Sequence, residues 1–252
     1  MKLEDIKSIG VLGGGVMGGG IAQTTALAGY RTIIRDINDE VLERTKNIIV
    51  DGRFGLKNGV ARGKHTREQM EQALANLSFT TRVADLKDCD LIIEAVPENM
   101  ELKQKVFAEL DKLVKKGAIF ASNSSALTHA EISKNVARKE RYLGWHWASP
   151  SNIMKMAELI YTRDTSEEVI RLVESLCQRL GKVSVRVKDV PGNTGYVGNR
   201  IWAAIRKEAQ KIIDEGIAAE EDIDTIMKTG WNWPAGPFEM TRGARTGWAQ
   251  KV

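Results

Sequence analysis

Along residues 1–189 the apolar positions form short runs that alternate with stretches of helical periodicity. The run at 91–96 is almost continuously apolar, which is typical of a strand buried on both faces of a parallel sheet. Strands are expected at 9–12, 32–36, 91–96, 118–122, 141–146, 156–161 and 182–187. Helices are expected at 21–28, 39–50, 53–77 (with glycine interruptions), 100–115, 129–137 and 166–180. This alternation predicts a Rossmann-type, doubly wound α/β sheet.

After residue 189 no strand pattern returns. The remaining pattern predicts two helices and a turn rich in Pro and Gly, at 199–215, 220–229 and 231–237. Gly216 suits the residue that follows the end of a helix, whereas residues 241–247 lack the apolar pattern of one. We therefore predict a dinucleotide-binding domain at 1–189 and a smaller, shortened all-α domain at 190–252.

Composition narrows the classes of function. With 42% apolar residues, the 252-residue chain can bury a sizeable core. The net charge of +4 is dispersed among acidic residues, so a nucleic-acid partner is not expected. Cys89 and Cys177 are far apart and match no metal-ligand spacing, so no metal is expected either. No signal peptide and no run long enough to span a membrane is recognisable, which predicts a cytoplasmic protein.

Three glycines, Gly13, Gly15 and Gly18, lie between the strand at 9–12 and the helix at 21–28. In a dinucleotide fingerprint the first glycine permits the tight turn, the second lets the backbone approach a pyrophosphate, and the third lets the helix pack closely on the strand. The helix N-terminus then faces the phosphates. Taken alone, the same pattern also suits an ordinary turn between a strand and a helix.

Asp36 ends the second predicted strand, roughly 20 residues after the glycines, where a carboxylate can accept hydrogen bonds from the adenosine ribose. A carboxylate at this position repels a 2′-phosphate, which favours NAD over NADP. The neighbouring Arg35 argues the other way, because an arginine can pair with that phosphate. The alternative for Asp36 is the N-cap of the following helix.

Polar residues follow the later strands, at the edge of the sheet where ligands bind in this fold. They are the cluster 122–125, His146 and, in the next apolar segment, Glu158. Oxidation of a hydroxyl group needs a base, and histidine suits neutral pH. A carboxylate orients the imidazole and favours its charged form, while a polar donor holds the substrate oxygen. His146, Glu158, Ser125 and Asn199 are candidates for that set.

Each candidate also has an ordinary structural explanation. A histidine after a strand is more often structural than catalytic. Ser125 is a possible N-cap for the helix near 129, and Asn199 for its own helix. A carboxylate such as Glu158 in an apolar segment is costly without a partner, which favours a functional role. His65, in a charged stretch, is expected to be solvated. The tryptophans are expected in the core or at an interface: Trp145, Trp147, Trp202, Trp231 and Trp233.

Several motifs, taken in order, match one family. They are Gly13-x-Gly15-Val16-Met17-Gly18, Glu94-Ala95-Val96-Pro97-Glu98-Asn99 with Lys103, Ser122-Asn123-Ser124-Ser125, Gly144-x-His146, Met154-Lys155-x-x-Glu158, Pro191-Gly192 with Asn199-Arg200, and Gly236-Pro237-Phe238-Glu239. Over residues 7–239 the chain resembles the NAD-dependent L-3-hydroxyacyl-CoA dehydrogenases, including the short bacterial 3-hydroxybutyryl-CoA type.

The resemblance implies oxidation of an L-3-hydroxyacyl-CoA to the 3-oxoacyl-CoA with NAD, in a homodimer. It implies that His146 is the base, that Glu158 is its partner, and that Ser125 and Asn199 contact the 3-oxygen of the substrate. The residues implied to bind the cofactor are Gly13, Gly15, Val16, Met17, Gly18, Asp36, Glu98, Lys103, Ser125 and Ser149. The basic residues implied to meet the CoA phosphates are Arg53, Lys57, Arg62 and Lys64.

The chain departs from the family pattern in several places. Ser149 stands where the family has an asparagine facing the nicotinamide amide. The segment from Gly192 to Asn199 is a few residues longer than usual, and the chain ends at Val252, soon after Glu239. These departures bear on cofactor orientation, on the placement of Asn199 and on the size of the second domain.

Two other functions remain open. A dehydrogenase of a non-CoA hydroxy acid or small hydroxy compound would use a different pocket, for which Trp145, Trp147 and the longer segment are candidates. A non-catalytic structural relative would explain a shortened second domain, but the presence of both His146 and Glu158 argues against it. A β-hydroxyacid dehydrogenase with a lysine base fits less well, because that base would lie on a helix.

Overall fold

A computed structural model of the chain describes residues 1–190 and 196–245. The chain divides into two compact units, residues 1–194 and 195–252. In the described part of the chain, no helix combines the length and the apolar character that a bilayer span requires.

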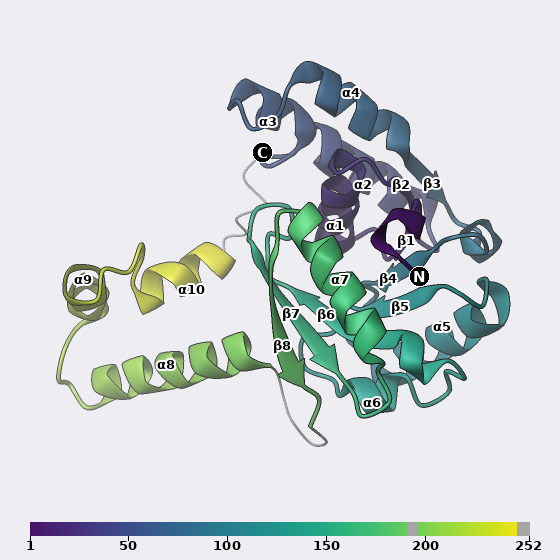
Figure 1. Cartoon of the computed structure of the whole chain (residues 1–252). Helices are drawn as coiled ribbons and strands as arrows, with labels where there is room; N and C mark the ends of the chain where they lie inside the picture. Colours follow the sequence, from purple (N-terminus) through teal and green to yellow (C-terminus); the bar gives the residue numbers. More distant parts are fainter. Residues whose placement is uncertain (191–195, 246–252) are drawn as a thin grey trace. The chain divides into compact units, whose positions relative to one another are not determined.

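The first unit is built on one eight-stranded sheet (Figure 1). Its strands are β1 Ser8–Leu12, β2 Arg31–Arg35, β3 Leu77–Thr80, β4 Leu91–Glu94, β5 Ile119–Ser122, β6 Tyr142–Trp147, β7 Met156–Tyr161 and β8 Val183–Lys188. They lie in the order β3-β2-β1-β4-β5-β6-β7-β8. The first six strands in this order are parallel to one another, β7 is antiparallel to β6, and β8 is parallel to β7. The order of the first six strands is that of the Rossmann fold, which confirms the predicted fold class.

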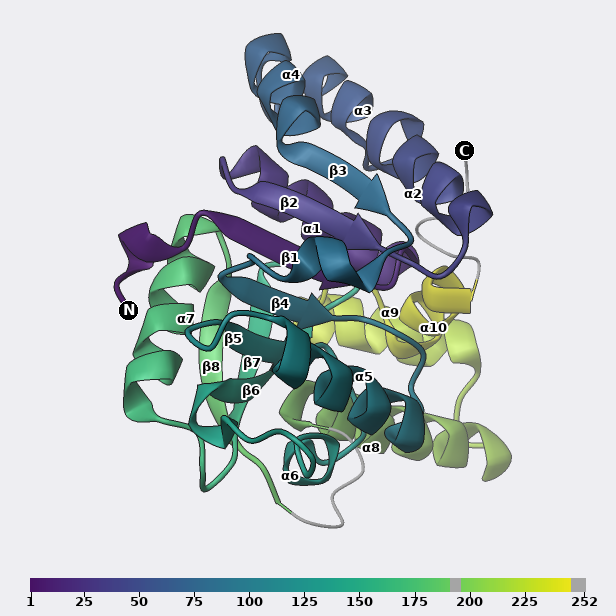
Figure 2. The ribbon, with the colours of Figure 1, turned by 90° about the vertical axis from the view of Figure 1, so that its right-hand side faces the viewer.

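Helices cover both faces of this sheet (Figure 2). They are α1 Val16–Leu27, α2 Asp39–Asp51, α3 Leu56–Ala61, α4 Arg67–Asn76, α5 Met100–Leu113, α6 His129–Ile132 and α7 Glu167–Arg179. Buried side chains of α1, α2 and α7 form one hydrophobic core with the sheet, and those of α5 belong to a second. In β4, Leu91 and Ile93 belong to the first core and Ile92 to the second, because successive side chains of a strand point to opposite faces. The continuous apolar run of β4 therefore reflects burial on both faces.

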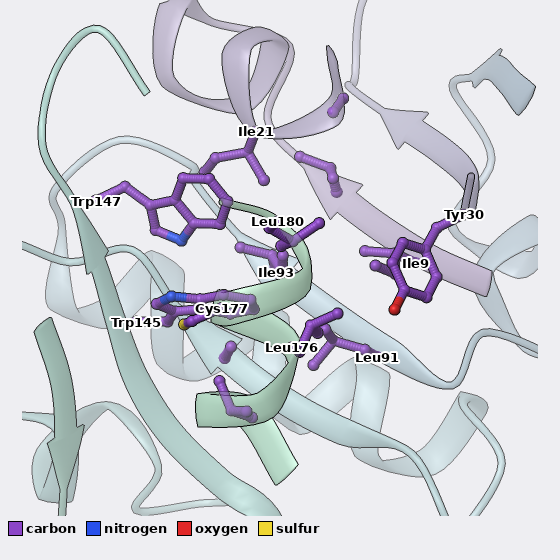
Figure 3. Close-up of a cluster of buried hydrophobic side chains, with 14 of the residues drawn as sticks. Ile9, Ile21, Tyr30, Leu91, Ile93, Trp145, Trp147, Leu176, Cys177 and Leu180 are labelled. Carbon is purple, nitrogen blue, oxygen red and sulfur yellow. The ribbon is translucent and has the colours of Figure 1, made fainter. Parts of the chain in front are cut away.

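Two tryptophans of β6 contribute large side chains to the first core. Trp145 and Trp147 are at most 1% exposed, and their ring centroids lie 5.1 Å apart. Figure 3 shows both indoles among buried side chains that come from α1, β4 and α7, including Ile21, Ile93 and Cys177. These two tryptophans are core residues, as expected from the sequence.

The structure corrects the predicted elements in three places. The helical segment expected at 53–77 is two helices, α3 and α4, followed by β3, which the sequence pattern missed. This strand has only four residues, which are half-buried or exposed, so it carries no apolar run. The helix expected at 129–137 is the single turn α6, which ends at Ile132. Residues 241–245, expected to be non-helical, belong to a helix.

The second unit contains three helices in its described part: α8 Val197–Asp214, α9 Glu220–Gly230 and α10 Pro237–Arg245. Gly216 follows α8 with φ 67°, as a helix-ending glycine should. The buried Asp224 of α9 accepts hydrogen bonds from the backbone N–H groups of Phe238 and Glu239, at 2.8 and 3.0 Å. A side chain of one helix thus satisfies the first N–H groups of the next and joins α9 to α10.

Candidate active site

The glycine turn joins β1 to α1 with a geometry that only glycine allows at two positions. Gly13 has φ 96°, and a Cβ on Gly18 would collide with the carbonyl oxygen of Gly13. A Cβ on Gly15, by contrast, would meet no atom of the protein within 4 Å. Gly15 therefore lies beside open space at the N-terminus of α1, where the N–H groups of the first turn have no partner within the helix. This arrangement fits a pyrophosphate.

Asp36 lies beside this turn, directly after β2. Its carboxylate accepts hydrogen bonds from the backbone N–H groups of Gly14, at 2.6 Å, and Ile37, at 2.7 Å. Asn38, and not Asp36, is the N-cap of α2, so the capping alternative is wrong. The Nε of Arg35 donates to the carbonyl oxygen of Thr81 at 3.2 Å. The acidic group thus lies at the glycine turn, while this nitrogen of Arg35 is directed to the loop after β3.

The loop after β5 is held by Glu98, which lies between β4 and α5. One oxygen of Glu98 accepts hydrogen bonds from the hydroxyl of Ser124, at 2.6 Å, and from the N–H groups of Ser125 and Ala126, at 2.9 and 3.0 Å. Burial opposes ionisation of Glu98, but these bonds and the charge of Lys103 outweigh it and lower the pKa of the carboxyl group. Ser125 is not the N-cap of α6, which is Thr128.

Lys103 and Glu94 form a buried ion pair behind this loop. The Nζ of Lys103 lies 2.6 Å from Glu94 and 3.3 Å from Glu98, and the side chains of Lys103 and Glu94 are at most 1% exposed. The hydroxyl of Ser122 donates to the other oxygen of Glu94 at 2.6 Å. Burial raises the pKa of Glu94, although Lys103 opposes this shift. No role for Glu94 is predicted from the sequence, yet it carries the signal that marks Glu158, a carboxylate within an apolar segment.

His146 and Glu158 face each other across β6 and β7. They are directly opposed in the antiparallel register, and the Nδ1 of His146 lies 2.7 Å from an oxygen of Glu158. Their side chains are 9% and 2% exposed. Because β1, β4, β5 and β6 are parallel, the glycine turn, the loop after β5 and the end of β6 lie along the same edge of the sheet. The predicted base and its carboxylate therefore lie at the edge that binds the dinucleotide.

Asn123 connects the loop after β5 to the strand that carries His146. Its Oδ1 accepts a hydrogen bond from the backbone N–H of Trp147 at 2.9 Å. Asn123 was part of the predicted polar cluster but had no role of its own. Its partner is a backbone group 24 residues away, which leaves no sequence signal.

Comparison with known proteins identifies the family. A model described as "3-hydroxyacyl-CoA dehydrogenase, NAD binding domain" matches residues 8–190, and one described as "3-hydroxyacyl-CoA dehydrogenase, C-terminal domain" matches residues 195–252. The chain belongs to the 3-hydroxyacyl-CoA dehydrogenase family. The NAD-binding model covers the glycine turn, Asp36 and the His146–Glu158 pair. The predicted family, enzyme class and cofactor, NAD, are confirmed.

Individual proteins and solved structures are similar to most of the chain. Mitochondrial hydroxyacyl-coenzyme A dehydrogenase of Rattus norvegicus is 37% identical over 238 residues, which is 93% of this chain and 75% of the rat protein. The crystal structure of (S)-3-hydroxybutyryl-CoA dehydrogenase from Ralstonia eutropha has a TM-score of 0.85 and 35% identity, covering 92% of this chain and 80% of that one. A diketoreductase structure, described as acting on dicarbonyl compounds, has a TM-score of 0.83 and 31% identity, covering 93% and 82%.

The other site residues predicted from the 3-hydroxyacyl-CoA dehydrogenase resemblance take no part in the hydrogen bonds described above for the glycine turn, the loop after β5 and the His146–Glu158 pair. Ser149 is exposed in the loop after β6. Asn199 lies inside the first turn of α8, in the second unit, and the N-cap there is Tyr196, so the capping alternative for Asn199 is wrong. Pro191 and Gly192 lie outside the described residues, and so does the first part of the longer segment from Gly192 to Asn199.

The basic stretch lies around α3. Arg53 is half-buried with its guanidinium 5.2 Å from the centroid of the Phe54 ring, and Lys57 pairs with Asp51 at 2.7 Å. Arg62 and Lys64 are exposed. His65 is not simply solvated as expected: it is half-buried, and its Nε2 lies 2.9 Å from the carbonyl oxygen of Leu56. In the described residues, no cluster of three or more His, Cys, Asp or Glu side chains has the arrangement of a metal site.

Proposed function

We propose that this protein oxidises an L-3-hydroxyacyl-CoA to the 3-oxoacyl-CoA, or catalyses the reverse reduction, with His146 as the base. The observation that carries the proposal is the 2.7 Å pair between Nδ1 of His146 and Glu158, at the same edge of the sheet as the glycine turn. A histidine buried against a carboxylate in a dinucleotide-binding fold suits proton transfer coupled to hydride transfer.

NAD, when bound, supplies the acceptor for the hydride that leaves C3 of the substrate. The Nε2 of His146 takes the proton of the 3-hydroxyl group, and the pair of electrons of that O–H bond forms the carbonyl. Glu158 holds the imidazole by Nδ1, which keeps Nε2 in the accepting tautomer and stabilises the imidazolium that forms. In the reductive direction the same nitrogen returns the proton.

Ser125 and Asn199 are assigned to the 3-oxygen of the substrate. The backbone N–H of Ser125 donates to Glu98, which fixes the loop and presents the serine at the edge of the sheet. Lys103 acts through Glu98 and Glu94, because its ammonium group is already surrounded by protein oxygens, the carbonyl of Val96 at 3.2 Å included. We therefore assign Lys103 to positioning the loop rather than to direct contact with NAD.

The remaining assignments concern the cofactor and the acyl-CoA. Val16, Met17 and Gly18 provide the first-turn N–H groups for the pyrophosphate, Asp36 binds the adenosine ribose, and Ser149 lies on the nicotinamide side. The basic residues assigned to the CoA phosphates are Arg53, Lys57, Arg62 and Lys64. The name of the Ralstonia eutropha relative favours a short acyl-CoA such as 3-hydroxybutyryl-CoA. The assembly and location proposed here are those expected from the sequence, a homodimer in the cytoplasm.

The deciding experiment mixes the purified protein with acetoacetyl-CoA and NADH and follows the loss of NADH absorbance. Parallel reactions replace the thioester with free acetoacetate, and NADH with NADPH. Turnover of the thioester with NADH supports the proposal. Turnover of the free acid without turnover of the thioester would instead favour a dehydrogenase of small carbonyl compounds, the activity that the diketoreductase relative suggests.

A further inference from the structure

Lys182 is a buried cation that no step of the proposed reaction uses. It lies in the turn between α7 and β8 and is 6% exposed. Its ammonium group donates to the carbonyl oxygens of Ser151 and, at 2.7 Å, Met154. It also lies 4.7 Å from the centroid of the Trp147 ring. A buried ammonium group is costly, so backbone oxygens and a ring face that replace its hydration point to a specific task.

In the part of the chain that the structure describes, no carboxylate lies within ion-pair distance of Lys182. Burial lowers the pKa of Lys182 to about 8, against a smaller opposing effect of Cys177. The interaction is therefore directed at backbone carbonyls and not at a counter-ion. Both carbonyls belong to one segment, the loop 148–155 that connects β6 to β7.

The loop 148–155 contacts the dinucleotide-binding helix on its other side. The hydroxyl of Ser151 donates to the carbonyl oxygen of Met17 at 2.9 Å. The side-chain amide of Asn152 donates to Gln23 at 3.0 Å and to the carbonyl oxygen of Phe54 at 2.8 Å. A Cβ on Gly20 would collide with the hydroxyl of Ser151, so the glycine permits this close approach. Loop and helix are thus fitted to each other.

The same loop begins next to the proposed base. Trp147, under the ammonium group of Lys182, follows His146 directly in β6, and Ser149 is two residues further on. Figure 3 shows the Trp147 indole beside Ile21 of α1. Lys182, the loop and the start of α1 therefore form a continuous set of contacts from the base to the glycine turn.

We propose that Lys182 is a positioning residue for NAD, which clamps the loop 148–155 against the start of α1. Three contacts of one ammonium group fix a loop that carries Ser149 and, two residues further on, binds the carbonyl of Met17 through Ser151. The inference rests on the NAD site of the proposed function. Its test measures binding of NADH alone, so failure of the turnover assay and failure of the clamp give different results.

The first variant is Lys182→Met, which keeps most of the length of the side chain and removes the charge. The matched control is Lys188→Met, at the exposed end of β8. If the released loop occupies its clamped arrangement about one tenth of the time, the Kd for NADH measured by titration calorimetry rises about 10-fold. The control variant should bind NADH like the wild type. A Lys182→Met protein that is less stable but binds NADH normally would show a purely structural role and overturn the proposal.

A second variant tests whether the effect passes through the loop. Ser151→Ala removes the hydrogen bond to Met17 on the far side of the loop and should also raise the Kd for NADH. Because the two variants release the same loop, the double variant should bind no more weakly than Lys182→Met alone. Fold-changes that multiply in the double variant would overturn the proposal. Lys182→Arg retains a cation for the two carbonyls and should keep most of the affinity for NADH. If Lys182→Met does not fold, Ser151→Ala provides the test.

Discussion

His146 and Glu158 occupy directly opposed positions on two antiparallel strands, with 2.7 Å between Nδ1 and the carboxylate. Both side chains are almost completely buried, so the pair is oriented by the sheet and not by mobile loops. Replacement of His146 by alanine should lower kcat about 100-fold or more in the acetoacetyl-CoA assay, because general base catalysis is lost. His65→Ala is the control, since His65 lies beside α3 and not at this edge of the sheet.

Glu158→Gln tests the carboxylate separately. The amide retains the size of the side chain but cannot stabilise the imidazolium, so kcat should fall by about 100-fold while the Kd for NADH is unchanged. If the two residues act as a unit, the double variant His146→Ala with Glu158→Gln should be no slower than His146→Ala alone. Full activity in Glu158→Gln would remove the carboxylate from the mechanism.

Asp36→Asn tests the cofactor preference. In the proposed complex the ribose hydroxyl donates a hydrogen bond to the charged carboxylate of Asp36. Such a bond contributes about 1.5–3 kcal/mol, so its weakening in the amide should raise the Kd for NADH by roughly 10-fold or more. The Kd for NADPH should change little or fall, since repulsion of the 2′-phosphate is removed. Asp39→Asn, an exposed residue in the first turn of α2, is the matched control. Equal changes in the affinities for NADH and NADPH would contradict the ribose assignment for Asp36.

Much of this architecture was visible in the sequence because it rests on local patterns. The run at 91–96 predicted a strand buried on both faces, and Glu158 was recognised because a carboxylate in an apolar segment needs a partner. What the sequence did not show are interactions with backbone atoms far along the chain. Asn123 bonds to the N–H of Trp147, and Lys182 to carbonyls 31 and 28 residues earlier. Such acceptors have no sequence signature. The strand β3 was missed because a short, half-buried edge strand shows no apolar run.

Lys103→Met tests the buried ion pair with Glu94. Removal of one member leaves an uncompensated buried carboxylate, so the free energy of unfolding should fall by about 3 kcal/mol in urea titrations. The double variant Glu94→Gln with Lys103→Met should recover part of this loss, because no charge remains buried. Lys105→Met, on the exposed face of α5, should be close to neutral. A fully stable Lys103→Met protein would show that the pair contributes nothing to folding.

His129 should make the stability of the protein sensitive to acid. It is completely buried, with Nδ1 2.9 Å from the hydroxyl of Tyr142 and the imidazole against Gly144. Burial, aided by the charge of Lys103, lowers the pKa of His129 to about 3. The unfolded chain titrates at about 6.5, so below that pH it binds a proton that the folded state does not, and acid favours unfolding.

The stability contributed by the neutral form of His129 is complete above about pH 6.5 and is lost as the pH falls from there toward 3. Between about pH 7 and pH 5 this single group should lower the free energy of unfolding by about 2 kcal/mol. His129→Gln cannot be protonated at this position, so its free energy of unfolding should lack this pH dependence. The difference in free energy of unfolding between the wild type and His129→Gln should therefore shrink as the pH falls. His65→Gln is the control, and urea titrations at the two pH values measure the effect. An identical pH dependence in wild type and His129→Gln would show that His129 does not cause the acid sensitivity.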